Sequence, residues 1–332
     1  MKKIHAGITG LLLFIAFNST NAQSAGIKLS KTFHIASPGG WDYLAVSGSK
    51  LYVSHGTQVN ILDKSSGDSI SIIPNTAGVH GIAFDNAGGK GYTSNGRSNN
   101  VSVFSLATNA VTGEIATGEN PDAIMYDGFS KKVVTCNGRS KDLSVIDPAT
   151  QKTVATIAVG GKPETAVSNE AGKWFVNIED KNEIVEIDAS GMKVLHHWPL
   201  APAEGPTGLA FDKKTNRLFA GCDKLLVVMN AADGTITDKL AIGDGCDGVA
   251  FDDAKSYVYT SNGEGTMTVI KESSNGKCSV LENITTNRAA RTIALDPATH
   301  AIYLPTADFE PLAAGERRPK MIPGSFQVLV LK

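Results

Sequence analysis

Residues 248–263, with the sequence GVAFDDAKSYVYTSNG, contain the unit that decides the fold. Two short stretches rich in Val, Phe and Tyr are separated by a polar turn, which predicts two antiparallel β-strands. The first stretch recurs as YLAVS (43–47), GIAFD (81–85), AIMYD (123–127), TAVSN (165–169), GLAFD (208–212) and TIALD (292–296). From position 85 onward, the last residues of successive copies are 42, 42, 43, 40 and 44 residues apart. The chain therefore contains seven repeats.

A repeat of about 40 residues with four short strands is typical of a β-propeller, whose blades pack against their neighbours. Helical repeats of similar length are disfavoured by the period-two alternation and by the Gly, Asn-Gly and Asp-Gly turns. We therefore predict an all-β, seven-bladed β-propeller with four-stranded blades. The last repeat ends with its third strand at residues 326–331, so residues 31–36 (KTFHIA) are expected to supply the missing strand and close the ring.

The second strands carry a recurring tetrapeptide. It reads YVSH at 52–55 and YTSN at 92–95 and 259–262. On these motifs the chain, from about residue 28 to its end, resembles the YVTN-repeat (YncE-type) β-propeller family. The resemblance implies the propeller fold, and it implies no single activity because one fold hosts many functions.

Residues 1–22 have the features of a secretory signal peptide: Lys2 and Lys3, an apolar stretch at 6–17, and Thr20-Asn21-Ala22 before Gln23. We expect the remaining residues, 23–332, to form one propeller domain in the periplasm or outside the cell, as a monomer. No second stretch is apolar enough to predict a transmembrane helix. The formal net charge is −2, which gives no basic footprint for nucleic acid.

The four cysteines, Cys136, Cys222, Cys246 and Cys278, contain no C-x-x-C pair that would indicate a zinc site or a redox motif. Cys222 ends a second strand and Cys246 precedes the next inner strand, so both are expected on the same face of adjacent blades. A disulfide between these two is predicted if their Cα atoms lie within about 7 Å.

Seven residues occupy equivalent positions, one at the start of each inner strand. They are expected to form a ring at one mouth of the channel: Asp42, His80, Asp122, Glu164, Thr207, Asp247 and Arg291. Loops on a rigid scaffold commonly carry function. Four carboxylates in one ring also require compensation by an ion, a proton or a ligand.

A second set lies at or just beyond the ends of the second strands, on the same face. Together with His80, Asp122, Glu164, Asp247 and Arg291, it completes the predicted ligand-binding residues: His55, Asn95, Arg97, Asn137, Arg139, Asn177, Glu179, Asp223, Asn262, Glu264 and Asp308. For each residue alone the alternative is structural, because Asn-Gly turns and Asp before a strand satisfy backbone groups. Arg beside Asp can likewise be a surface ion pair.

One form of compensation is a divalent cation such as calcium, which prefers carboxylate and amide oxygens. By analogy with propeller lactonases and gluconolactonases of another family, Glu164, Asn177 and Asp247 are its expected ligands. His55 and His80 would instead favour a transition metal, or they are hydrogen-bonded structural residues.

Two functions remain open at this point. The first is a binding protein for a small polar ligand, zwitterionic or sugar-like, or for a cell-envelope protein or glycan; no G-x-S-x-G or H-E-x-x-H motif is present. The alternative is a metal-dependent hydrolase in which His80, Glu164 or Asp247 acts as general acid or base.

Overall fold

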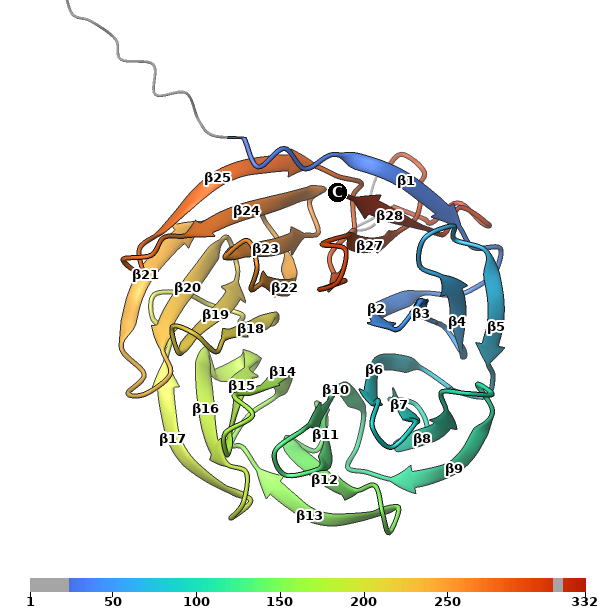
Figure 1. The fold of residues 1–332 in the computed structure, drawn as a ribbon, viewed down its shortest axis with the longest axis horizontal. Helices are drawn as coiled ribbons and strands as arrows, with labels where there is room; N and C mark the ends of the chain where they lie inside the picture. The colour runs from blue at the N-terminus through green and yellow to red at the C-terminus, as the bar shows by residue number, and fades with distance from the viewer. Residues whose placement is uncertain (1–23, 313–318) are drawn as a thin grey trace, which may run out of the picture.

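The computed structural model describes residues 24–312 and 319–332. These residues form seven four-stranded antiparallel sheets arranged as a ring around a central axis (Figure 1), which confirms the predicted seven-bladed propeller. The predicted signal peptide, residues 1–22, lies outside the described residues. No helix in the described ranges is long and apolar enough to cross a membrane.

The first three blades follow one another along the chain, and their strands are given from the innermost outward. They are β2 (Trp41–Ser47), β3 (Lys50–His55), β4 (Gln58–Asp63) and β5 (Ser69–Ile73); β6 (Val79–Asp85), β7 (Lys90–Asn95), β8 (Asn100–Ser105) and β9 (Val111–Ala116); and β10 (Pro121–Asp127), β11 (Lys132–Asn137), β12 (Asp142–Asp147) and β13 (Lys152–Ala158).

Blades 4 to 6 have the same plan, with a 3-10 turn, η1 (Glu179–Lys181), added in blade 4. Their strands are β14 (Pro163–Ser168), β15 (Lys173–Ile178), β16 (Glu183–Asp188) and β17 (Lys193–Pro199); β18 (Leu209–Asp212), β19 (Arg217–Cys222), β20 (Leu225–Asn230) and β21 (Ile236–Ala241); and β22 (Cys246–Asp252), β23 (Tyr257–Asn262), β24 (Thr266–Glu272) and β25 (Cys278–Thr285).

Blade 7 joins the two ends of the chain. It consists of β26 (Ala294–Leu295), β27 (Ile302–Thr306), β28 (Gln327–Leu331) and the N-terminal β1 (Leu29–His34). β1 pairs antiparallel with β28, and Phe33 lies opposite Val328. Phe33 is 4% exposed. The prediction that an N-terminal segment closes the last blade is therefore confirmed.

The core is divided into seven hydrophobic clusters, one between each pair of adjacent blades. Successive residues of a second strand face opposite neighbours, because side chains alternate across a strand. Val133 belongs to the cluster between blades 2 and 3, and Val134 belongs to the cluster between blades 3 and 4. Each second strand is thus buried on both faces, including its Ser, Thr and Asn side chains.

The recurring Asp at the end of the inner strands is explained by turn geometry on the face away from the candidate site. Asp85 Oδ1 accepts a hydrogen bond of 2.9 Å from the main-chain nitrogen of Gly88. Asp212 and Asp252 accept equivalent bonds from the backbone of their own turns. These carboxylates cap turns.

Candidate functional site

The inner strands are irregular where the ring residues lie. Pairing with the second strand shifts register between Trp41 and Leu44, and again at the equivalent place in blades 2, 3, 4 and 6. Each shift encloses one predicted ring residue: Asp42, His80, Asp122, Glu164 and Asp247. Bulges of this kind bend a strand and redirect a side chain. The irregularity therefore presents these five side chains at the mouth of the channel.

Hydrogen bonds between blades fix the backbone of the ring. Ser94 Oγ in blade 2 donates to the main-chain oxygen of Asp122 in blade 3. Asn177 Nδ2 donates to the main-chain oxygen of Thr207 at 3.0 Å, and Thr207 Oγ1 donates to that of Cys246 at 2.6 Å. The ring is therefore held from outside by neighbouring blades.

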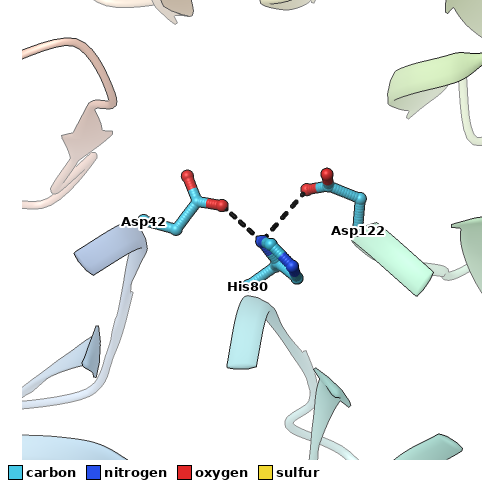
Figure 2. A group of neighbouring side chains, drawn as sticks. All are labelled: Asp42, His80 and Asp122. Atoms are coloured by element: carbon cyan, nitrogen blue, oxygen red, sulfur yellow. Dashed lines mark hydrogen bonds and ion pairs between the residues drawn. The ribbon is translucent and has the colours of Figure 1, made fainter. Parts of the chain in front are cut away.

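Three ring residues from adjacent blades converge (Figure 2). His80 Nδ1 lies 2.6 Å from Asp42 Oδ2 and 3.7 Å from Asp122 Oδ1. Since one nitrogen faces both carboxylates, His80 carries a proton on Nδ1. The side chains of Asp42, His80 and Asp122 are 15%, 28% and 17% exposed, so all three are largely shielded from water.

Arg291 extends this cluster towards blade 6. Its guanidinium forms an ion pair with Asp247 and lies 3.9 Å from Asp42 Oδ1. A continuous row of alternating charges therefore crosses blades 6, 7, 1, 2 and 3. Opposite charges at this distance favour the ionised forms.

A second charged group lies in blade 4. Lys162 Nζ is 2.6 Å from Glu164 Oε1 and also contacts Glu179 Oε2. Glu164 is 8% exposed. Sequence reasoning overlooked Lys162, which lies two residues before Glu164, just outside β14.

Tyr43 packs across the propeller axis, near the ring carboxylates. It belongs to β2 of blade 1, yet it contacts the hydrophobic cluster between blades 3 and 4. Burial raises its pKa well above the ordinary value, and four carboxylates on different blades raise it further: Asp122, Asp42, Asp247 and Glu164. Tyr43 is therefore an apolar neighbour of the ring carboxylates. Sequence reasoning did not identify it, because it cannot place a bulge.

Burial and crowding shift the protonation of the ring carboxylates. Burial, reinforced by Asp122, raises the pKa of Glu164 to about 8, against the opposing effect of Lys162. Burial also raises the pKa of Asp122 to about 6. For His80, burial acts to lower the pKa, but the hydrogen bond to Asp42 and the charge of Asp122 outweigh it and raise the pKa.

A cavity of about 290 Å³ opens beside the Asp42 and His80 side chains, and Arg97, Asn120 and Arg291 also line it. Arg97 is exposed, and its guanidinium makes no hydrogen bond or ion pair with any residue in the described part of the chain. Arg139, at the equivalent position of blade 3, does not line this cavity. Arg97 thus offers a free cationic group in the cavity that the Asp42 carboxylate also lines.

Three asparagines predicted to bind a ligand are used inside the fold instead. Asn137 Oδ1 accepts a bond of 2.9 Å from Thr135, while its Nδ2 donates to Asp142 and Ser144 at 2.7 and 2.9 Å. Asn95 and Asn262 repeat this arrangement. We therefore assign a structural role to these buried asparagines in place of the predicted ligand-binding role.

His55, which is also predicted to bind a ligand, is likewise used inside the fold. It is fully buried, and its two ring nitrogens are paired with Ser37 Oγ and, at 2.8 Å, with the main-chain oxygen of Gly39. Its ring stacks on Phe326 with centroids 4.0 Å apart. His55 therefore stabilises the joint between blades 7 and 1.

The predicted cation ligands Glu164, Asn177 and Asp247 have other partners. Glu164 pairs with Lys162, and Asp247 pairs with Arg291. Asn177 is fully buried and donates both amide hydrogens to the main chain of blade 5. Asn177 Oδ1 is buried without a hydrogen-bond partner. Among the described residues, Asp42, His80 and Asp122 lie together as a group with metal-ligand spacing.

The remaining predicted residues lie around the mouth. Glu264 accepts a bond of 2.9 Å from Thr266. Asp308 accepts one of 3.1 Å from Gln327. Asp223 and Arg139 are exposed.

Cys222 and Cys246 are unbonded thiols in the structure, as are Cys136 and Cys278. Cys222 Sγ lies 3.7 Å from the main-chain oxygen of Ala220, and Cys246 Sγ lies 3.6 Å from that of Gly248. The predicted disulfide is therefore not formed here. The expectation that both cysteines lie in adjacent blades agrees with the strand order.

The fold and its charged mouth define a seven-bladed propeller with a candidate binding site at one end of the channel. No protein-family model and no curated protein matches the chain. Among solved structures, a chain of Kuenenia stuttgartiensis hydrazine synthase is similar, with a TM-score of 0.72, 15% sequence identity, and coverage of 82% of this chain and 94% of that one. At this identity the likeness shows the fold alone.

Proposed function

We propose that this protein is an exported, YVTN-type propeller that binds a small polar ligand at the channel mouth. The tetrapeptides at 52–55, 92–95 and 259–262 support the family assignment, and the features of residues 1–22 support export. The site supports the binding function, because rigid loops surround a cavity lined by fixed charges.

The observation that carries the proposal is the free guanidinium of Arg97 beside the carboxylate of Asp42 in one cavity. Guanidinium binds carboxylate or phosphate in a bidentate manner, and Asp42 can accept bonds from ammonium or hydroxyl groups. The ligand class that fits both is a small zwitterion or a sugar acid. An envelope protein or glycan that presents such a group would use the same contacts.

A panel of amino acids, sugar acids and neutral sugars, tested by thermal shift and then by calorimetry, tests this function. Binding of an acidic member should weaken at least tenfold in Arg97→Ala. Arg139→Ala is the matched control, because Arg139 occupies the same repeat position outside the cavity. Equal binding by both variants, or no binding by wild type across the panel, would overturn the proposal.

A metal-dependent hydrolase is the second candidate, and one observation favours it. Burial raises the pKa of Glu164 to about 8, so this group is able to hold and release a proton near neutral pH, as a general acid must. Chelator-sensitive hydrolysis of lactones or esters that is lost in Glu164→Gln would support this function. A rate that is unchanged in that variant would exclude Glu164 from it.

A further inference from the structure

We propose that Asp42, His80 and Asp122 form a binding site for one divalent transition-metal ion, with zinc as the best fit. The site lies in the cavity of the proposed function but does not require the organic ligand. The residues come from three consecutive blades, and none of them is a ligand of the calcium-type site expected from the sequence.

The positions of the three donor atoms support the site. Asp42, His80 and Asp122 each offer one ligand atom, and these atoms all lie within 4.8 Å of one another. His80 Nδ1 is central, at 2.6 Å from one carboxylate and 3.7 Å from the other (Figure 2). Zinc would replace the proton on this nitrogen, because a histidine ligand binds a metal in its neutral form. Zinc binds nitrogen and oxygen ligands at about 2.0–2.2 Å. Side-chain movements within this cluster would bring the donors to these distances around one ion.

The backbone beneath the donors is fixed in advance. Thr292 Oγ1 donates to the main-chain oxygen of Asp42 at 2.6 Å, and Ser94 Oγ donates to that of Asp122. Gly96 leaves room for the imidazole, because a Cβ at this position would lie 2.7 Å from His80 Nε2. A preorganised site requires such support for its ligands.

The carboxylate of Asp122 has few hydrogen-bond or ion-pair partners within the protein. Its carboxylate is 17% exposed, accepts no hydrogen bond from any described residue, and has His80 at 3.7 Å as its ion-pair partner. A buried carboxylate without close partners is unfavourable. A cation bound between Asp42 and Asp122 would neutralise both carboxylates.

The donor set selects the kind of metal. Imidazole nitrogen suits zinc and its transition-metal neighbours, whereas calcium requires six to eight oxygen ligands. Three protein ligands leave at least one coordination position free, as in zinc sites that bind water or substrate. That position would face the cavity of about 290 Å³.

Calorimetry on the full mature chain, stripped with a chelator and titrated with ZnCl₂, tests the site. We expect one zinc per chain, with at least tenfold weaker binding in His80→Gln and in Asp122→Asn, and no comparable binding of CaCl₂. Cobalt(II) titration gives a second readout, because its visible absorption bands depend on the coordination geometry and the ligands and should change in His80→Gln.

His300→Gln is the matched control. His300 Nδ1 lies 2.8 Å from Asp252 Oδ2, so this pair resembles His80 with Asp42 but has no second carboxylate. The His300→Gln variant should bind zinc as wild type does. Absence of zinc binding by wild type, or binding unchanged in both site variants, would mean a hydrogen-bonded triad without a metal. If His80→Gln fails to fold, Asp42→Asn and Asp122→Asn decide the question. None of these outcomes depends on Arg97, so failure here leaves the organic-ligand test intact.

Discussion

The hydroxyl of Thr292 donates a hydrogen bond of 2.6 Å to the main-chain carbonyl oxygen of Asp42. Thr292 precedes the inner strand of blade 7, and Asp42 lies in that of blade 1, so this bond crosses the joint where the ring closes. The same joint is closed on the outside by the N-terminal strand β1. The position of Asp42 at the charged mouth therefore depends on the joint that closes the ring.

Phe33→Ala should weaken the closing joint. Phe33 is 4% exposed, whereas Leu29 on the same strand is 57% exposed. Removing a buried aromatic ring costs about 3–5 kcal/mol of the free energy of unfolding, and a change at an exposed position costs about 0.5 kcal/mol or less. Urea denaturation of Phe33→Ala beside Leu29→Ala measures the difference. Equal losses would show that β1 does not dock as the closing strand.

Asn137→Ala should destabilise blade 3 even when no ligand is present. The change removes three side-chain hydrogen bonds and leaves Thr135, Asp142 and Ser144 short of partners. Each buried polar group left unpaired costs about 1–3 kcal/mol. The midpoint of thermal unfolding, compared with that of Asn283→Ala at an exposed asparagine, measures the loss. A wild-type midpoint for Asn137→Ala would contradict the structural role.

Glu164→Gln should stabilise the protein more at pH 9 than at pH 5. The folded pKa of Glu164 is raised from 4.5 to about 8. Below pH 4.5 the group is protonated whether folded or unfolded. As the pH rises from 4.5 to 8 the unfolded chain releases this proton first, so the free energy of unfolding falls. Glutamine stays neutral and avoids this loss, which we expect to reach about 2–4 kcal/mol.

The measurement for Glu164→Gln is the difference in unfolding midpoint from wild type at the two pH values. Glu170→Gln, at an exposed glutamate in a turn on the opposite face, controls for the loss of one negative charge. The same difference at pH 5 and pH 9 for Glu164→Gln would show that the carboxyl is not shielded as the structure indicates.

The sequence was sufficient to predict the blades, their number and the closing strand, because each repeat must bury both faces and therefore keeps its apolar alternation. It also placed Asp42, His80, Asp122 and Asp247 at equivalent positions around one mouth. Which charges pair could not be predicted, because the pairing depends on bulges that redirect each side chain by a few ångströms. Arg291 for example pairs with Asp247 and lies near Asp42.

Asn177 shows why the second set of residues was harder to predict. The sequence pattern places it with Asn95 and Asn137 at the end of a second strand. In the structure Ile178 occupies that position and pairs with Pro163, as Asn137 pairs with Pro121. A shift of one residue moves a side chain to the opposite face of a sheet. Asn177 therefore points to blade 5 and binds its main chain, as Ser94 does to blade 3.

Thiol counting tests the cysteine assignment. Four free thiols should react with Ellman's reagent in denaturant without reductant. In the native protein Cys222 and Cys246 should not react, because burial raises the pKa of Cys222 to about 12 and raises that of Cys246 as well, and only the thiolate is nucleophilic. Two thiols in denaturant, rising to four after reduction, would restore the disulfide predicted from the sequence.

Tyr43→Ala should destabilise the protein, whereas Tyr43→Phe should not. The ring of Tyr43 packs against the cluster between blades 3 and 4 across the channel, and its hydroxyl makes no hydrogen bond with any described residue. Phenylalanine keeps the packing and loses no bond, so its unfolding midpoint should match wild type. Alanine removes the contact, at a cost of about 2 kcal/mol or more. Equal loss in both variants would show that the hydroxyl, and not the ring, matters. An unchanged unfolding midpoint in both variants would show that the packing of Tyr43 does not contribute to stability.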